Sequence, residues 1–198
     1  MICGLELTDL TRAIYPNIEN GQALTNQYFL EHVILCPRNV KVGEINSLMR
    51  GLFPGGSRTY SSADSIQGAK DGAQYLVEYL NSINTGGLPP SQLEVKIGVP
   101  LMLLRNLDPG LGLCNGTSLR LMRIINRVLH VKIINGSCAE EMTFIPRIKL
   151  ISSEELPFEL HRVQFPVRLA FGMTINKSQG QSLGTVGLEL CNPVFGHR

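Results

Sequence analysis

Apolar positions in the first part of the chain predict short helices, one buried strand and one longer helix. Residues 5–31 have the spacing of short amphipathic helices, with a break at Pro16. The run HVILC at 32–36 is apolar after its first residue, which is typical of a strand buried on both faces of a parallel sheet. From Val42 to Phe53 the apolar residues recur at helical spacing until a Pro-Gly-Gly stop. A strand, a short loop and a helix in this order predict an α/β unit of a wound sheet.

The middle of the chain changes to β-type patterning. Residues 57–72 are polar and rich in serine and are predicted to be loop, a helix is predicted at 74–83, and a linker rich in Gly and Pro follows. Five short β-type runs come next, with turn signals between them that include Asn115-Gly116 and Asn135-Gly136. Such closely spaced runs predict a small antiparallel barrel. The runs are LEVKI, PLMLL, TSLRLMRII, RVLHVKII and MTFIPRIKL.

The last part of the chain returns to an α/β pattern. After a polar segment at 152–162, the run QFPVRLAF at 164–171 is predicted to be a strand. MTINKSQGQ at 173–181 is expected to open as a loop and continue into a helix, and VGLEL at 186–190 is predicted to be a further buried strand. The chain as a whole is therefore predicted to be α/β with a small all-β insert.

Composition indicates a globular chain with unevenly distributed charge. The 198 residues are 43% hydrophobic and 17% charged, with a formal net charge of +2, which predicts one or two folded domains. Residues 96–149 carry eight Lys and Arg against three Asp and Glu, whereas residues 1–95 carry six against nine. The basic segment indicates a polyanionic partner, and a solvated basic surface without a partner is the alternative.

The five cysteines are scattered and predict free thiols in a reducing compartment. No CxxC pair and no Cys/His cluster with zinc spacing is present, so no metal site is expected. The first residues are too polar for a secretory signal, and no apolar run approaches the ~18 residues that a membrane span needs. We therefore expect a soluble intracellular protein without a membrane partner.

One polar segment has the residue types of a phosphate or nucleic-acid contact. TINKSQGQ at 174–181 follows a predicted strand and offers a hydroxyl, a lysine and a predicted helix N-terminus. Gly180 would allow close approach of another backbone. A polar helix cap without a ligand is the alternative. The sequence contains no GxxxxGK[ST] loop and no apolar strand that ends in Asp-Glu, so no catalytic residue is assigned.

Six segments resemble segments of one protein family and occur in the same order as in that family. They are VILCPRNVKVGEIN at 33–46, TYSSADS at 59–65, GVPLMLLRNLDPGLGLCNGTSLRL at 98–121, FIPRIKL at 144–150, PFELHRVQFPVRLAF at 157–171 and AFGMTINKSQGQSL at 170–183. The last resembles motif V of superfamily-one helicases of the Pif type, including the helicases carried by Helitron transposons. The other five are similar to further segments of that family, so the resemblance extends from about Ile14 to Phe195.

The resemblance implies a particular fold and domain order. It implies the second RecA-like (P-loop NTPase-type) domain of such a helicase, α/β in class, with an inserted small antiparallel β-barrel-like subdomain. Residues 28–89 and 150–198 would form the RecA-like domain and residues 90–149 the insert. Residues 1–27 would connect it to a first RecA-like domain.

The resemblance also implies which residues contact ligands. Gln179 and Gly180 would lie near the phosphates of ATP. Asn39 belongs, with Pro37 and Asn46, to the motif after the first strand, and Asn115 and Thr117 belong to the insert, where a simple turn at Asn115-Gly116 is the alternative role. The nucleic-acid-binding candidates are Thr174, Asn176, Lys177, Ser178, Asn39, Asn115 and Thr117.

The departures from the family decide what activity is expected. The first RecA-like domain, with its phosphate-binding loop and Asp-Glu pair, and the segment that supplies an arginine to the γ-phosphate have no counterpart in these residues. Phosphoryl transfer needs those groups, so ATP and Mg²⁺ are expected as cofactors of the full-length family and hydrolysis by this chain alone is not. Gly172 replaces the family's usual Ala, and Ser118 replaces its usual Arg.

The expected function is therefore part of an ATP-dependent DNA helicase that unwinds DNA while translocating on single strands. Its expected partners are single-stranded DNA and the first RecA-like domain. The family implies the nucleus, with the mitochondrion as the second location, and roles in DNA repair, recombination and telomere maintenance. The alternatives are a non-enzymatic single-stranded nucleic-acid-binding module, a decayed transposon remnant, or a chain that folds poorly on its own.

Overall fold

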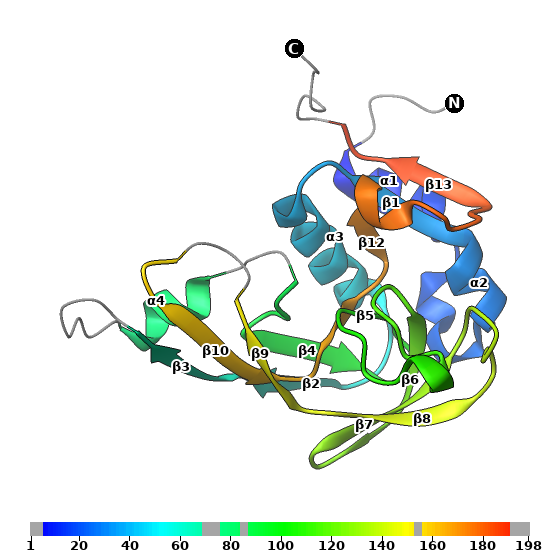
Figure 1. Ribbon diagram of the computed structural model, residues 1–198. Coiled ribbons are helices and arrows are strands. Elements are labelled where there is room, and N and C mark those ends of the chain that lie inside the picture. Colours follow the sequence, from blue (N-terminus) through cyan, green and yellow to red (C-terminus); the bar gives the residue numbers. More distant parts are fainter. Residues whose placement is uncertain (1–5, 69–75, 84–86, 153–155, 191–198) are drawn as a thin grey trace.

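The computed structural model describes residues 6–68, 76–83, 87–152 and 156–190 (Figure 1). Its first elements are α1 (Leu7–Ile14), the 3-10 helix η1 (Ile18–Ala23), α2 (Asn26–Glu31), β1 (His32–Cys36) and α3 (Asn39–Leu52). A small parallel sheet places β1 between β12 (Gly172–Thr174) and β13 (Thr185–Leu188). Helices α1 and α3 pack on this sheet, and α2 leads directly into β1.

The predicted pattern of residues 6–53 is confirmed. β1 coincides with the predicted run at 32–36, and both of its neighbours are parallel to it, as its unbroken apolar character implied. α3 begins slightly before the predicted apolar pattern and buries Val42, Ile45 and Met49. Phe53 is fully buried at the C-cap of this helix, directly before the Pro-Gly-Gly stop.

Most of the predicted β insert, joined by β11 from the later part of the chain, forms a five-stranded antiparallel sheet in the order β11-β5-β6-β7-β8 (Figure 1). Its strands are β5 (Pro100–Leu103), β6 (Ser118–Ile125), β7 (Val128–Ile133), β8 (Met142–Pro146) and β11 (Val167–Leu169). The tight hairpin lies between Ile125 and Val128, whereas the two Asn-Gly pairs lie in longer connections that precede β6 and β8. Both glycines have the positive φ that made these pairs turn signals.

The prediction of a loop at 57–72 is wrong for its first part. β2 (Ser57–Ser61) pairs with β4 (Gln92–Lys96), and β3 (Ala63–Gln67) pairs with β10 (Glu159–Gln164), which in turn pairs with β9 (Ile148–Ile151). β10 also lies partly in the segment predicted to be polar connection. β2, β3 and β10 are short and largely polar, and β2 and β3 pair with strands that are far away in sequence, so no local apolar pattern marks them.

The helix predicted at 74–83 is confirmed where the structure describes it, as α4 (Val77–Ser82); its first two residues lie outside the described residues, as do Cys3 and Cys191. Cys36, Cys114 and Cys138 are free thiols. Among the described residues, no helix is long and apolar enough to span a membrane.

The helix predicted after β12 is wrong. The chain forms only one 3-10 turn, η4 (Ile175–Ser178), before Gly180 adopts a left-handed conformation with φ of 80°. Glycine is suited to that conformation, which ends a helix. The backbone N–H of Gly184 then donates to the carbonyl oxygen of Glu31 at 3.1 Å and ties the segment to the end of α2. The motif therefore lies in a turn between two parallel strands.

A buried ion pair fixes the β3-β10-β9 sheet to its surroundings. Arg162 on β10 donates from Nε to Asp64 Oδ1 at 3.0 Å and from Nη2 to Asp64 Oδ2 at 2.7 Å. The other guanidinium protons reach the carbonyl oxygens of Leu80, Ile83 and Pro89 at 2.9 to 3.2 Å. Side-chain exposure is 0% for Arg162 and 5% for Asp64. This arginine has a structural role, because it joins two strands, α4 and the segment before β4.

Candidate nucleic-acid interface

Two of the predicted segments meet at one edge of the parallel sheet. β1 and β12 run in the same direction, with Cys36 paired to Thr174, so both strands end at the same edge. From there β1 leads to Asn39 at the start of α3, and β12 leads into the 3-10 turn that holds Lys177. The carboxyl edge of a parallel sheet is the usual place for ligands in open α/β folds.

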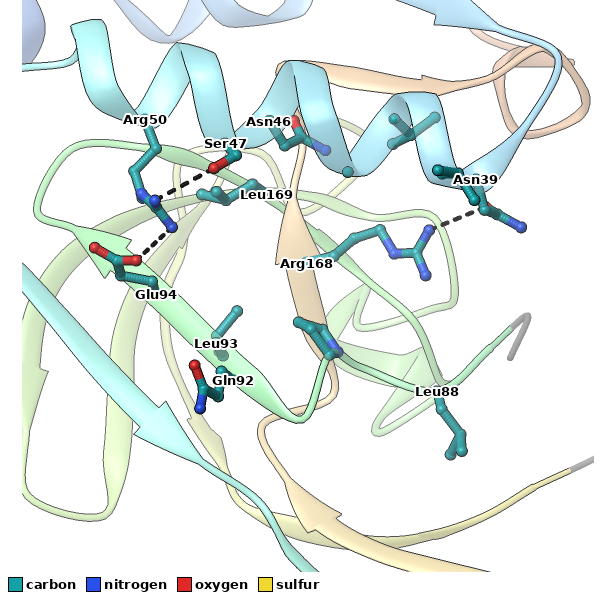
Figure 2. Close-up of a pocket in the computed structure, with 14 residues that line it drawn as sticks. Asn39, Asn46, Ser47, Arg50, Leu88, Gln92, Leu93, Glu94, Arg168 and Leu169 are labelled. Atoms are coloured by element: carbon teal, nitrogen blue, oxygen red, sulfur yellow. Dashed lines mark hydrogen bonds and ion pairs between the residues drawn. The ribbon is translucent and has the colours of Figure 1, made fainter. Parts of the chain in front are cut away.

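Arg168 on β11 enters this edge from the insert sheet. Its Nη1 donates to Asn39 Oδ1 at 3.4 Å, and Figure 2 shows the guanidinium directed toward the beginning of α3. Its Nε is buried without a hydrogen-bond partner. Burial lowers the pKa of this guanidinium. No described carboxylate lies within ion-pair distance of it, so its charge is not neutralised by the described part of the chain.

Lys177 is the second cation at this edge. Burial is the main cause that lowers its pKa to about 8, and the positive charge of Arg168 lowers it further. Two half-buried cations thus raise each other's electrostatic free energy. An anion bound between them would relieve both the repulsion and part of the desolvation.

The start of α3 adds further donors at the same place. The helix is 14 residues long, and its N-cap residue, Arg38, makes no side-chain capping hydrogen bond. The first backbone N–H groups of a helix have no partner within the helix, and the helix dipole is positive there. The edge therefore combines a helix N-terminus with two cationic side chains.

A cleft of about 400 Å³ opens beside Arg168, between α3 and the beginning of β4 (Figure 2). The guanidinium of Arg50 lies at its other end and is neutralised, because Nη1 is 2.6 Å from Glu94 Oε2. The uncompensated charge in the cleft is therefore at the Arg168 end. Residues of the helix, the segment before β4 and β11 line the cleft, among them Asn39, Gly43, Asn46, Pro90, Gln92 and Leu169.

Comparisons with known proteins identify the fold and the family resemblance. Residues 78–133 match the family model for the 2B domain of the DNA helicase Pif1. The ATP-dependent DNA helicases PIF1 of Xenopus laevis and Danio rerio are each 27% identical to this chain, over 159 and 163 residues. These alignments cover 79% of the chain and 23% of each relative, so the chain spans about a quarter of their length.

The structural neighbours agree with this result. Pif1 helicase from Candida albicans has a TM-score of 0.59 at 17% identity, covering 97% of this chain and 54% of that structure. Bacteroides Pif1 bound to single-stranded DNA has a TM-score of 0.56 at 18% identity, covering 91% and 42%. The resemblance to Pif-type DNA helicases is confirmed.

The predicted fold class is confirmed as well: a RecA-like α/β domain with an inserted antiparallel β subdomain. The domain boundaries and the narrower Helitron-like assignment stay predictions.

Asn46, which was predicted to belong to the motif after β1, holds two structural elements together. Its side chain is buried, its Oδ1 accepts from the backbone N–H of Gly172 at 3.0 Å, and its Nδ2 donates to the carbonyl oxygen of Gly172 at 3.2 Å. This pair of bonds attaches β12 to α3. Gly172 also packs tightly, because an added Cβ would lie 3.0 Å from Ile45 Cγ2. The departure from the family's Ala at 172 therefore accompanies a close approach of strand and helix.

The other residues predicted as contacts after β12 differ in how exposed they are in the turn. Thr174 and Ser178 are half-buried, and Ser178 Oγ donates to the carbonyl oxygen of Ile175 at 2.7 Å, which stabilises the 3-10 turn. Asn176, Gln179 and Gly180 are exposed. The exposed amides are free of the turn's own hydrogen bonding, so they are the more accessible contacts for DNA or ATP, and their roles stay predictions.

Asn115 and Thr117 lie in the connection from β5 to β6. Thr117 Oγ1 donates to the carbonyl oxygen of Gly112 at 2.8 Å and accepts from the N–H of Cys114 at 3.1 Å. Asn115 is exposed, and its backbone N–H donates to Asn106 Oδ1 at 2.7 Å. The hydroxyl of Thr117 therefore stabilises the turn, whereas the side chain of Asn115 makes no hydrogen bond within it. A contact of either residue with DNA stays a prediction.

Sequence reasoning did not find Arg168. The signal was present, since Arg168 is the one charge within the apolar run QFPVRLAF. A charged residue in a predicted buried strand must either be paired or have a function. In the described residues no group of three or more His, Cys, Asp or Glu could hold a metal ion.

Proposed function

We propose that this chain is part of an ATP-dependent DNA helicase and binds the backbone of single-stranded DNA at the carboxyl edge of the β12-β1-β13 sheet. The observation that carries the proposal is the proximity of Arg168 to Lys177, two half-buried cations that form no ion pair within the described residues. Its support comes from the relatives named ATP-dependent DNA helicase PIF1 and from the Bacteroides Pif1 bound to single-stranded DNA.

The chemistry of this edge fits a phosphodiester. A phosphate oxygen accepts hydrogen bonds from a guanidinium, an ammonium and helix N–H groups, and Arg168, Lys177 and the start of α3 offer all three. These donors read charge and not base identity, so binding should be independent of sequence and should weaken as salt rises.

We further propose that ATP is bound at an interface with another RecA-like domain. In this arrangement Gln179 and Gly180 lie near the ATP phosphates, and Mg²⁺ is held by the other domain. The 198 residues contain no GxxxxGK[ST] loop, so alone they should bind DNA without hydrolysing ATP. A phosphate-release assay on the chain, with and without DNA, checks this. DNA-stimulated release would contradict it.

The proposed location of the protein in the cell is inferred from the family that it resembles. We propose the nucleus, or the mitochondrion, and a role in DNA repair, recombination or telomere maintenance. Imaging of the tagged chain in its own cells tests the location.

Fluorescence anisotropy with labelled oligo(dT) tests the DNA site. Arg168→Glu should weaken binding at low salt by about tenfold or more, because it removes a donor and places a carboxylate beside the DNA backbone. Arg12→Glu is the matched control, since Arg12 is exposed on α1 and the change in net charge is the same. Equal losses in both variants would show a general charge effect and overturn the site.

A further inference from the structure

The outer face of strands β6, β7 and β8 carries a row of basic and aromatic side chains. The strand register places Arg123 opposite His130, and His130 opposite Phe144. Burial alternates along β7 and β8, so that Leu129 and Ile145 are fully buried while Phe144 lies on the opposite face with 54% exposure. The alternation shows that the row faces outward, away from the core.

The two rings of the row form a ready stacking platform. The centroids of His130 and Phe144 are 4.8 Å apart, with an angle of 22° between the ring planes. Strand pairing holds both rings, so little conformational entropy remains to be lost when a third ring stacks on them. More than half of the Phe144 side chain is exposed to solvent, although the folded chain buries most of its other phenylalanines.

The charge beside the platform has one sign. Arg123 is exposed next to the platform, and Arg127 is exposed in the tight turn between β6 and β7, which projects at the bottom of Figure 1. Neither arginine forms an ion pair within the described residues. Lys132, at the other end of β7, is neutralised by Glu140 at 2.9 Å. The uncompensated positive charge therefore lies in the row itself, at Arg123, and at the nearby turn, at Arg127.

We propose that the Arg123–His130–Phe144 row is a second contact for single-stranded nucleic acid, in which a base stacks on Phe144 and His130 while Arg123 and Arg127 contact the adjacent phosphates. The partner's identity rests on the proposed function, whereas the site stands on its own geometry. An exposed ring backed by a second, half-buried ring beside unpaired cations resembles the stacking platforms that bind single strands without base preference.

This face complements the first site in its chemistry. The edge with Arg168 and Lys177 offers only donors for phosphate, and the row adds a surface for bases. A single strand that contacts both would be held by its backbone on the RecA-like domain and by a base on the insert. We infer that the insert contributes binding free energy through stacking as well as through charge.

The absence of tryptophan from the chain gives a direct test. Phe144→Trp introduces one tryptophan at the platform, and its fluorescence should be quenched when oligo(dT) is added. An abasic oligonucleotide of equal length has the same charge and no bases, so it should leave the fluorescence nearly unchanged. Phe144→Ala should weaken oligo(dT) binding in anisotropy by about tenfold and should hardly affect the abasic strand.

Val77→Trp is the control reporter, because Val77 on α4 is 65% exposed and lies in neither proposed DNA contact. Quenching of both tryptophans alike, or quenching of Trp at 144 by the abasic strand, would overturn base stacking. Anisotropy that rises without quenching at 144 would remove the row and leave the Arg168 site intact. A blue shift of the emission with protein concentration, without DNA, would instead identify the row as a contact between two copies. Quenching at 144 that persists in the Arg168→Glu background would support the row, and it would count against the first site only if it needed no more oligo(dT) than in the parent.

Discussion

Two arginines only six residues apart in the sequence show how differently the same side chain is used. Arg162 on β10 has no exposed surface, and its donors reach the carboxylate of Asp64 and three carbonyl oxygens. Arg168 on β11 is half-buried, its Nε has no partner, and one 3.4 Å bond to Asn39 is the only hydrogen bond of its side chain in the described residues. The first arginine completes the fold, and the second leaves a charge without a counter-ion.

The difference teaches which buried charge points to a ligand. A buried cation costs free energy unless it is paired, and at Arg162 Asp64 supplies that pairing within the chain. At Arg168 the nearby charge is the ammonium of Lys177, which has the same sign. Burial and the charge of Arg168 together lower the pKa of Lys177 to about 8. Two such cations held close together therefore gain the most electrostatic stabilisation when an anion binds between them. Satisfied and unsatisfied arginines are therefore to be separated before a basic region is assigned to nucleic acid.

Removal of the buried arginine should give the largest effect. Arg162→Met leaves Asp64 buried without a counter-ion and three carbonyl oxygens without donors, so the free energy of unfolding should fall by about 3–5 kcal/mol. Urea unfolding measures this loss. The double variant Arg162→Met with Asp64→Leu should recover much of it, because no charge then remains buried. A loss below about 1 kcal/mol in the single variant would mean that the pair behaves as an exposed one.

The same substitution at the other arginine should leave stability almost unchanged. Arg168→Met removes a partly desolvated charge that has no carboxylate partner, so the free energy of unfolding should stay within about 1 kcal/mol of the parent or rise. Oligo(dT) binding should nevertheless weaken by about fivefold to tenfold. Urea unfolding and anisotropy on the same preparation separate the two effects. A large loss of stability here would remove the contrast between the arginines.

Local sequence patterns predicted those parts of the fold whose burial is decided locally. β1 and α3 carry enough apolar residues in the right period to specify their own burial, and both were predicted closely. β2, β3 and β10 could not be predicted in this way, because polar residues form them and pairing with distant strands holds them. The helix expected after Thr174 failed because Gly180 and the bond of Gly184 to Glu31 turn the chain back to the sheet.

The residues of the candidate site likewise divide into those that local sequence patterns reveal and those that only the tertiary structure brings together. The motif around Lys177 and the residue Asn39 were visible in the sequence because they follow strands in recognisable segments. Their proximity depends on the parallel register of β1 and β12, and Arg168 joins them from a third strand of another sheet. A tertiary arrangement of this kind has no local pattern. The lone arginine in an apolar strand was the only available signal.

The smallest expected effect is a pH dependence that has opposite signs for stability and for DNA binding. The pKa of Lys177 is about 8 in the folded chain against 10.5 for an ordinary lysine, so between these values the unfolded chain binds more protons. Stability contributed by this residue therefore rises with pH from about 8 toward 10.5. DNA phosphates bind the charged form, so affinity should fall a few-fold as pH rises through 8.

Lys177→Met is the reference for this measurement, since Tyr28 and Cys36, whose pKa values burial raises to about 12, destabilise the fold as pH rises and do so equally in both proteins. The difference in urea midpoint between parent and variant should therefore move in favour of the parent above pH 8. Lys177→Arg keeps its charge, and its DNA affinity should stay level from pH 7 to 9 while that of the parent falls. Parallel curves for parent and Lys177→Arg would show that Lys177 does not titrate at the DNA site, and the repulsion between Lys177 and Arg168 would then no longer explain why an anion is needed there.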